Sequence, residues 1–214
     1  MAYISPETGK LQLTVVYDGP PRAGKTATMY SLSDELKRRV QTPVRGGRTL
    51  YFDWLIYDAG SFNGEPLEVL TLSVPGQTQL NERREFLLAM ADSVIFVVDS
   101  TREHVQESRD YYLRSLEFLQ NGGRPVPVLL QMNKRDIEDA LPRAELDEMF
   151  VDDRPQPWIE ESVASEGTGV RKAFIQAVSL AVAEVQRDLD NGADLSVGHS
   201  FSSAEELMER LREL

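Results

Sequence analysis

The chain has 214 residues, 41% of them hydrophobic and 27% charged, a composition typical of a globular domain with one hydrophobic core. Its net charge of −12 opposes binding to nucleic acid and to anionic membrane surfaces, both of which need clustered lysine and arginine. The absence of cysteine excludes disulfides, thiol-based metal sites and lipidation through cysteine.

Short apolar runs alternate with longer amphipathic ones in the first part of the chain. Residues 11–17 predict a strand, and residues 26–40 predict a helix whose basic end suits a helix C-terminus. The polar segment 41–48 contains a proline and two glycines and therefore predicts a loop. Two further strands are predicted at residues 50–57 and 67–73, joined by a turn-rich stretch at residues 58–65 that suits a hairpin.

The same alternation continues to residue 189. Helices are predicted at residues 81–91, 103–120, 142–150 and 169–189, and strands at 93–99, 127–132 and 158–163. Strands that alternate with helices predict a three-layer α/β fold, in which a doubly wound and mostly parallel sheet carries helices on both faces. The hairpin would add one antiparallel strand to that sheet.

The composition changes near the C-terminus. Residues 190–200 are rich in Gly, Asp and Ser and predict a linker, whereas residues 201–214 predict a short amphipathic helix with serines at its start. Its apolar face either docks on the parent domain or offers a helix to a partner groove. We therefore expect a globular domain at residues 1–189, a linker at 190–200 and a helical extension at 201–214.

The segment from Gly19 to Thr26 reads G-P-P-R-A-G-K-T and matches the phosphate-loop pattern G-x-x-x-x-G-K-[ST]. It follows a predicted strand and opens a predicted helix, and a tight loop in that place directs backbone N–H groups at an anion. Pro20 and Pro21 have no N–H to donate, so the cradle is expected to begin at Arg22. The alternative is a chance glycine-rich turn that caps a helix. The expected nucleotide contacts are Gly19, Arg22, Ala23, Gly24, Lys25, Thr26 and Ala27, with Lys25 on the β- and γ-phosphates and Thr26 on Mg²⁺.

A second motif distinguishes GTP from ATP. Asn133-Lys134-Arg135-Asp136 directly follows an apolar strand, at a strand end where ligands bind in α/β proteins. The Asp136 carboxylate can accept from both N1–H and N2–H of guanine, and adenine offers no such pair of donors. The Lys134 stem can lie along the base or ribose, and Asn133 can tie this loop to the phosphate loop. A polar turn of ordinary composition is the alternative.

These motifs and their order resemble the small GTPases of the Ras superfamily, from about residue 11 to residue 189. The segment Arg48-Thr49-Leu50-Tyr51-Phe52-Asp53 and the segment Ser73-Val74-Pro75-Gly76-Gln77 resemble the bacterial MglA-like group of polarity and gliding regulators, which similarly lacks an acidic residue at position 73. The segment Glu161–Ser165 resembles the loop whose backbone contacts the guanine carbonyl. That resemblance implies base contacts from Val163 and Ala164.

The resemblance also implies catalytic roles. Thr49 would sense Mg²⁺ and the γ-phosphate, with Thr42 as its competitor for the metal, and Gly76 would donate its N–H to the γ-phosphate. Gln77 would orient the attacking water, and Arg48 would act as an arginine finger supplied by the same chain, beside Lys25. The alternative for Arg48 and Gln77 is that both are solvated loop residues.

Two departures from the family pattern affect catalysis. Pro21 stands where most Ras-like proteins have glycine, and its fixed φ and added bulk beside the γ-phosphate imply slow intrinsic hydrolysis. Ser73 replaces an aspartate, which implies a weaker or water-mediated surrounding for Mg²⁺. A third departure, Gly47 in place of an acidic residue, bears on how the neighbouring loop closes.

We therefore expect a cytoplasmic GTPase that binds GTP or GDP with Mg²⁺, acts as a molecular switch and has no membrane anchor and no nucleic-acid partner. The resemblance implies a roadblock/LC7-type GTPase-activating protein of the MglB kind, effectors, and a role in cell polarity or gliding motility. One alternative is a nucleotide-binding scaffold with negligible hydrolysis, suggested by Pro21 and Ser73. Another is an ATP-dependent kinase or ATPase on the same phosphate loop, which the Asn133–Asp136 motif opposes.

Overall fold

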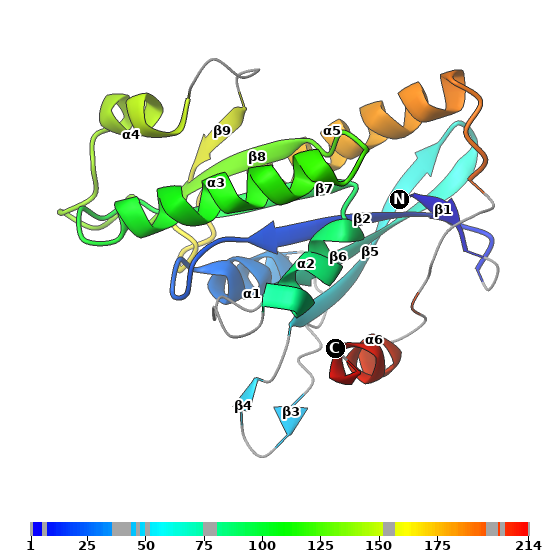
Figure 1. The fold of residues 1–214 in the computed structure, drawn as a ribbon, viewed down its shortest axis with the longest axis horizontal. Helices are drawn as coiled ribbons and strands as arrows, with labels where there is room; N and C mark the ends of the chain where they lie inside the picture. The colour runs from blue at the N-terminus through cyan, green and yellow to red at the C-terminus, as the bar shows by residue number, and fades with distance from the viewer. Residues whose placement is uncertain are drawn as a thin grey trace.

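A computed structural model describes residues 2–5, 8–35, 44–45, 48–49, 52–74, 81–151, 157–195, 201 and 204–213. Its centre is a seven-stranded sheet with strand order β5-β6-β2-β7-β8-β9, and β1 adds a short antiparallel pair with β2 (Figure 1). The strands are β1 (Tyr3–Ile4), β2 (Leu11–Asp18), β5 (Asp53–Phe62), β6 (Glu65–Ser73), β7 (Ser93–Asp99), β8 (Val128–Asn133) and β9 (Trp158–Glu161). The strands from β6 to β9 pair in parallel, while β5 runs antiparallel to β6.

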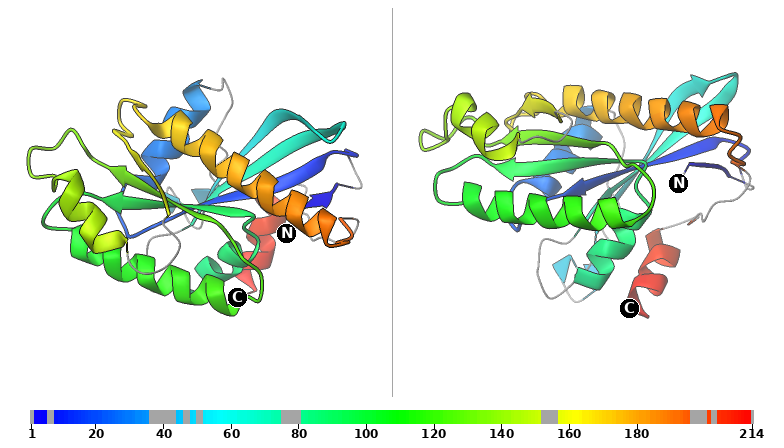
Figure 2. Two further views of the ribbon diagram at one scale, coloured as in Figure 1. Left: turned by 90° about the horizontal axis from the view of Figure 1, so that it is seen from above. Right: turned by 45° about the horizontal axis from the view of Figure 1, so that its top comes forward.

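Helices cover both faces of this sheet, which confirms the predicted three-layer α/β fold. The helices are α1 (Lys25–Glu35), α2 (Asn81–Ala89), α3 (Val105–Asn121), α4 (Arg143–Phe150), α5 (Val170–Asp190) and α6 (Ala204–Arg212). Seen from above, α5 and α3 lie on opposite sides of the sheet (Figure 2). Helices α1 and α5 share one buried cluster with the strands, and α2, α3, α4 and α6 belong to the two clusters that lie on the other face.

The central strand β2 shows why the sheet forms. All eight of its residues are buried, as expected for a parallel strand covered on both faces. Because side chains alternate along a strand, Val15 and Tyr17 enter the cluster with α1 and α5, and Val16 enters the cluster with α2. The strand ends at Asp18, directly before the phosphate loop, so its burial fixes the position of that loop.

The predicted hairpin is longer than the sequence analysis proposed. Strands β5 and β6 extend to Phe62 and from Glu65, so the turn is only Asn63-Gly64 rather than residues 58–65. Both turn residues have positive φ, 51° and 89°, the backbone that Asn-Gly adopts in a two-residue hairpin turn. The polar residues read as a turn are in fact the exposed ends of the two strands, where solvent rather than packing surrounds them.

Several predicted boundaries also differ. The described part of the first helix ends at Glu35, and residues 36–43, including Thr42, lie outside the described residues. The predicted loop at 41–48 contains a short antiparallel pair, β3 (Val44–Arg45) and β4 (Arg48–Thr49). No helix in the described part of the chain is long and apolar enough to cross a lipid bilayer.

The C-terminal helix α6 docks on the parent domain, one of the two alternatives for its apolar face. Leu207 and Leu211 are fully buried, and Met208 is nearly so. They join the cluster that contains Leu87 and Leu88 of α2. The segment before the helix is held as well, because the rings of Phe201 and Phe86 pack edge to face with centroids 6.2 Å apart.

Candidate nucleotide-binding site

Three of the predicted motifs meet at one edge of the sheet. The phosphate loop follows β2, the Asn133–Asp136 motif begins at the last residue of β8, and the Glu161–Ser165 loop begins at the last residue of β9. These strands run parallel, with β7 between β2 and β8, so their carboxyl ends lie side by side. Ligands of open α/β sheets bind at this edge.

The phosphate loop has the backbone of an anion cradle. Gly19, Arg22 and Gly24 have positive φ values of 139°, 62° and 111°, and α1 begins immediately afterwards at Lys25. Alternating backbone signs of this kind turn successive N–H groups toward one point, at the positive end of a helix dipole. Arg22 adopts this conformation although it is not a glycine.

Glycine is required at position 24 for a reason that the sequence analysis did not identify. A Cβ built on Gly24 would lie 2.2 Å from Nδ2 of Asn133, inside the closest approach of real atoms. At Gly19 a Cβ would lie 2.4 Å from the carbonyl oxygen of Val97 in β7. Both glycines therefore allow the loop to pack against neighbouring strand ends, and the position of the cradle depends on that contact.

Lys25 is buried inside the loop. Its Nζ donates to the carbonyl oxygens of Gly19 and Pro20 at 2.7 and 2.8 Å. Burial, together with the nearby charge of Arg84, lowers the pKa of Lys25 to about 8, although the carboxylates of Asp18 and Asp53 oppose the shift. The ammonium group therefore lies among carbonyl dipoles at the centre of the cradle, where a phosphate could accept from it.

A single side chain joins the three motifs. Asn133 Nδ2 donates to the carbonyl oxygen of Ala23 at 2.8 Å, and its Oδ1 accepts from the N–H of Ala164 at 2.9 Å. The same Oδ1 accepts from the Ser162 hydroxyl at 3.0 Å. The predicted contact between Asn133 and the phosphate loop is thereby confirmed. The side chain is buried, so these bonds form away from competing water.

A buried glutamine, Gln131, adds hydrogen bonds to the junction around Asn133. Gln131 Nε2 donates at 3.1 Å both to the Thr28 hydroxyl on α1 and to the Ser162 hydroxyl. Ser162 in turn donates to Asn133, so α1, β8 and the loop after β9 belong to one hydrogen-bonded network. The network fixes the loops relative to one another, which a site for an extended ligand requires.

Lys134 and Asp136 of the second motif lie in different surroundings. Lys134 has a positive φ of 64°, and its Nζ pairs with Oδ2 of Asp99, the last residue of β7, at 2.5 Å. Asp99 was not among the predicted site residues, although it ends a buried apolar strand at the same edge. Asp136 is exposed. Its carboxylate is therefore open to a ligand approaching from solvent.

A pocket of about 710 Å³ lies between the start of α1 and the loop that joins β9 to α5. Its volume is in the range of sites for small molecules and cofactors. Two of the predicted contact residues line it, Ala27 from α1 and Ala164 from the loop. Val163 precedes Ala164 and is buried, with its N–H bonded to the carbonyl of Thr168 at 3.0 Å, which closes the loop on itself. One predicted contact residue from each of these two segments therefore lines the cavity.

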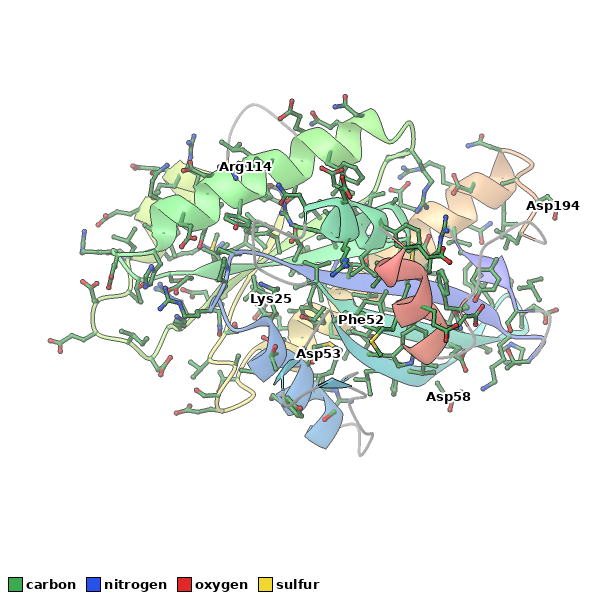
Figure 3. All side chains as sticks on the ribbon, turned by 60° about the horizontal axis from the view of Figure 1, so that its bottom comes forward. Lys25, Phe52, Asp53, Asp58, Arg114 and Asp194 are labelled. Atoms are coloured by element: carbon green, nitrogen blue, oxygen red, sulfur yellow. The ribbon has the colours of Figure 1, made fainter. Side chains whose placement is uncertain are left out.

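The structure adds Asp53, a carboxylate to which the sequence analysis gave no role. Its Oδ2 accepts from the Thr26 hydroxyl at 2.9 Å, and the side chain is buried (Figure 3). Asp53 and Ser73 are direct neighbours across β5 and β6. Thr26, the predicted Mg²⁺ ligand, therefore has an acidic group beside it. This group comes from β5, the strand next to the one that carries Ser73. The signal in the sequence was the one charged residue within the apolar run Leu50–Tyr57.

A second buried carboxylate, also missed, fastens α2 to the base of the phosphate loop. Arg84 Nε and Nη2 donate to the two carboxylate oxygens of Asp18, each at 2.8 Å, and Ser115 of α3 donates to Asp18 at 2.7 Å. The Arg84 guanidinium also lies 5.2 Å from the ring centroid of Tyr111. Burial opposes ionisation of Asp18, but the charge of Arg84 and these hydrogen bonds hold its pKa below the ordinary value.

The residues with predicted catalytic roles are described only in part. Arg48 and Thr49 form β4, and their backbone alone is described. Gly76 and Gln77 lie outside the described residues. Within the described residues, no cluster of three or more His, Cys, Asp or Glu side chains could hold a metal ion. Thr26 and Asp53 nevertheless supply oxygen groups of the kind Mg²⁺ prefers when substrate phosphates provide the remaining ligands.

Comparison with known proteins agrees with this geometry. Residues 8–181 match the sequence model of the ADP-ribosylation factor family. The chain is 25% identical over 195 residues to the mutual gliding-motility protein MglA of Myxococcus xanthus (strain DK1622), covering 87% of this chain and 99% of that protein. Among solved structures, the Arl6 BBS3 small GTPase from Trypanosoma brucei with bound nucleotide analogue GppNp matches with a TM-score of 0.61 and 24% identity, over 81% of this chain and 99% of that chain.

Proposed function

The chain belongs to the ADP-ribosylation factor family of small GTPases, and on that premise we propose which residues carry its GTP-binding switch and what the switch controls. The observation that carries the proposal is the Asn133 side chain, which hydrogen-bonds to Ala23 and to Ala164 and so holds phosphate loop and base-reading loops together. A nucleotide has both a polyphosphate and a base, and this junction would place their binding groups around one ligand.

The nucleotide would bind with its phosphates over the start of α1. Backbone N–H groups from Arg22 onward would surround the phosphates, and Lys25 would leave its two carbonyl partners to bind the β- and γ-phosphates. Asp136 would accept from N1–H and N2–H of guanine, and the N–H of Ala164 would be shared with the base. The domain would comprise residues 1–189, with a linker at 190–200 and the helical extension at 201–214.

Mg²⁺ would be held by the hydroxyls of Thr26 and Thr49, with the Asp53 carboxylate orienting its water ligands in place of an aspartate at position 73. When bound, the ion would neutralise charge on the phosphate oxygens. Gln77 would orient the water that attacks the γ-phosphorus, Arg48 would stabilise charge on the phosphoryl oxygens, and Gly76 would donate its N–H there. The products would be GDP and inorganic phosphate.

Hydrolysis by the isolated protein would be slow, because Pro21 occupies space where the water and Gln77 must meet. Replacing Pro21 with glycine should raise single-turnover hydrolysis by about 10- to 100-fold, the effect of relieving a small misplacement of reacting groups. Pro20→Ala retains the carbonyl oxygen that accepts from Lys25 and serves as the matched control. A Pro21→Gly rate equal to or below that of the wild type would contradict the idea and favour the alternative of a nucleotide-binding scaffold.

The cellular process would be polarity or gliding motility in the cytoplasm. The support is the similarity to a protein named for mutual gliding motility, which extends over nearly all of that protein. An activating partner of the roadblock/LC7 type, similar to MglB, would then speed hydrolysis. Adding such a protein in a single-turnover assay should raise the rate for wild type and leave Gln77→Leu slow.

The binding proposal is tested by the nucleotide itself. Protein purified without added nucleotide should release GDP or GTP on denaturation, and GTP should compete for the site far better than ATP. Asp136→Asn should exchange a carboxylate acceptor for an amide that can donate, and so shift preference from guanine toward xanthine. ATP bound as tightly as GTP, or Asp136→Asn without change in base preference, would reject the assignment.

A further inference from the structure

Asp18 is a fully buried charge at the base of the phosphate loop, outside the G-x-x-x-x-G-K-T pattern that begins at Gly19. Its carboxylate accepts from Nε and Nη2 of Arg84 on α2, each at 2.8 Å, and from the hydroxyl of Ser115 on α3 at 2.7 Å. The backbone N–H of Gly19 also hydrogen-bonds to it. Because a buried charge is costly unless such partners compensate it, α2, α3 and the loop all converge on this one side chain.

Gly19 links this carboxylate to the centre of the cradle. The N–H of Gly19 bonds to Asp18, and its carbonyl oxygen accepts from Lys25 Nζ at 2.7 Å. Gly19 has a φ of 139°, and a Cβ there would lie 2.4 Å from the carbonyl oxygen of Val97, so the loop passes β7 at close range. The hydrogen bonds therefore run from Asp18 through a single, closely packed residue to the ammonium group of Lys25.

The charge of Asp18 also acts on Lys25 directly. Burial lowers the pKa of Lys25, and the carboxylate of Asp18 is the strongest of the groups that oppose this change. Asp53 on β5 and Glu107 on α3 oppose it more weakly, whereas Arg84 on α2 lowers the pKa. Asp18 therefore favours the charged form of the lysine that a phosphate would contact.

The contacts that Asp18 makes beyond α2 favour a role toward the loop. To fasten α2 the carboxylate needs only Arg84, and apolar side chains of similar volume can replace a buried ion pair without loss of stability. Ser115 and Gly19 hold the same carboxylate from two other directions. A side chain that α2, α3 and the loop all hold has a fixed position, which is what a group that aligns a binding site requires.

We propose that Asp18 is a positioning residue of the phosphate site, which fixes the Gly19 peptide and the place of Lys25 and so acts on bound phosphates without touching them. The proposal rests on the proposed nucleotide site, and it adds a residue outside the phosphate-loop pattern to the groups that set the affinity of that site. Because Lys25 is assigned to the β- and γ-phosphates, the effect of Asp18 belongs to these phosphates. Binding of GDP should therefore depend on Asp18 more than binding of GMP, which has only the α-phosphate.

The test compares the dissociation constants of GMP and GDP for the full-length protein. Their ratio, GMP over GDP, measures what the β-phosphate contributes, because base, ribose and α-phosphate are common to both ligands. Asp18→Asn keeps the shape of the side chain and removes its charge. Asp92→Asn is the matched control, because Asp92 is equally buried and pairs with Arg124 at 3.2 Å. Asp92 also accepts from the N–H of Thr14, which lies on the same strand as Asp18 and four residues before it.

Asp18→Asn should reduce this ratio by about 10- to 100-fold, as substitution of groups that support a metal-binding side chain does. The pH at which GDP affinity begins to fall should also move downward, because loss of the carboxylate lowers the pKa of Lys25 further and the neutral amine binds phosphate poorly. A general loosening of the fold would weaken GMP and GDP alike and leave the ratio unchanged. The proposal is overturned if either change is absent from Asp18→Asn or equally present in Asp92→Asn.

A double variant separates the loop from the fastening of α2. Asp18→Asn alone leaves Arg84 buried without its carboxylate, whereas Asp18→Asn combined with Arg84→Met leaves no buried charge unpaired and should regain stability. The ratio of dissociation constants should stay low in the double variant, and recovery of the wild-type ratio would assign the effect to α2 and overturn the proposal.

Measurement of AMP and ADP on the same proteins keeps the two proposals distinct. Wild-type protein that prefers ADP to GDP rejects the guanine assignment, while the ratio of the AMP and ADP dissociation constants still tests Asp18. Wild-type protein that binds GDP, with the same ratio in Asp18→Asn, leaves the proposed function standing and overturns the role of Asp18. Failure of the wild type to bind either diphosphate rejects the phosphate site and both proposals with it.

Discussion

At the residue scale, the charge of Lys25 depends on pH near neutrality, because its burial in the folded protein lowers the pKa of its ammonium group. Its pKa of about 8 means that about half of the free protein lacks this charge at pH 8, while a bound phosphate would restore the proton. Affinity for GDP should therefore be constant below pH 7 and fall as the pH rises above 8. Binding near pH 8 should take up about 0.5 proton, which calorimetry in buffers of different ionisation enthalpy measures. GDP affinity that does not change from pH 7 to 9 would show that Lys25 stays charged.

Asp53 is the second residue with a testable part in the site. Asp53→Asn keeps the size of the side chain but removes the charge beside Thr26, so the Mg²⁺ concentration needed to slow GDP release should rise by about 10- to 100-fold. The matched control is Asp58→Asn on the same strand, because Asp58 is half exposed and pairs with Lys10 away from Thr26. If GDP release from the two variants depends equally on Mg²⁺ concentration, Asp53 does not take part in Mg²⁺ binding.

At the level of elements, one buried ion pair, between Arg84 and Asp18, fastens α2 to the end of β2. Removal of Arg84 would leave the fully buried Asp18 without its partner, so Arg84→Ala should lower the free energy of unfolding by roughly 3–5 kcal/mol. Glu85→Ala, at an exposed position of the same helix, should change it by less than about 0.5 kcal/mol. Denaturant titration of the GDP-bound proteins measures both, and a small loss in Arg84→Ala would mean that water enters to solvate Asp18.

Elements differ in how well their sequence predicted them. The strands at β2, β7 and β8 were found to within a residue or two because burial on both faces makes them continuous apolar runs. The hairpin was predicted too short, because its distal part is mostly exposed. Only Ala59 and Phe62 pack against the core there, which leaves little alternation to recognise. Its Asn63-Gly64 turn was nevertheless present in the sequence as a two-residue signal.

At the scale of the whole molecule, α6 should contribute little to nucleotide affinity. Its buried side chains belong to the cluster that contains Leu87 and Leu88 of α2, whereas α1 belongs to the cluster on the other face of the sheet. Truncation after residue 195 should therefore leave GDP affinity within about twofold. Fluorescent nucleotide titration measures this affinity, and a large loss would mean that the C-terminal helix is part of the nucleotide site.

The sequence by itself determined the class of fold, and it located the phosphate-loop pattern and the Asn133–Asp136 motif, because both motifs consist of contiguous residues whose spacing is set by local backbone geometry. It also located Asn133 as the link between loops. The roles of Arg48, Thr49, Gly76 and Gln77 remain predictions from resemblance, since their side chains lie outside what the structure describes.

Only the tertiary structure decided which distant residues complete these motifs. Asp53 reaches Thr26 because β5 pairs antiparallel with β6, and Asp18 meets Arg84 because α2 crosses the end of β2. A charge within an apolar run singles out Asp53, but local sequence does not identify the partner in either pair, since the partners are separated by 27 and 66 positions. For α6 too, the periodicity of the sequence predicted the apolar face. The surface that this face covers depends on contacts between distant segments, which form only when the whole chain folds.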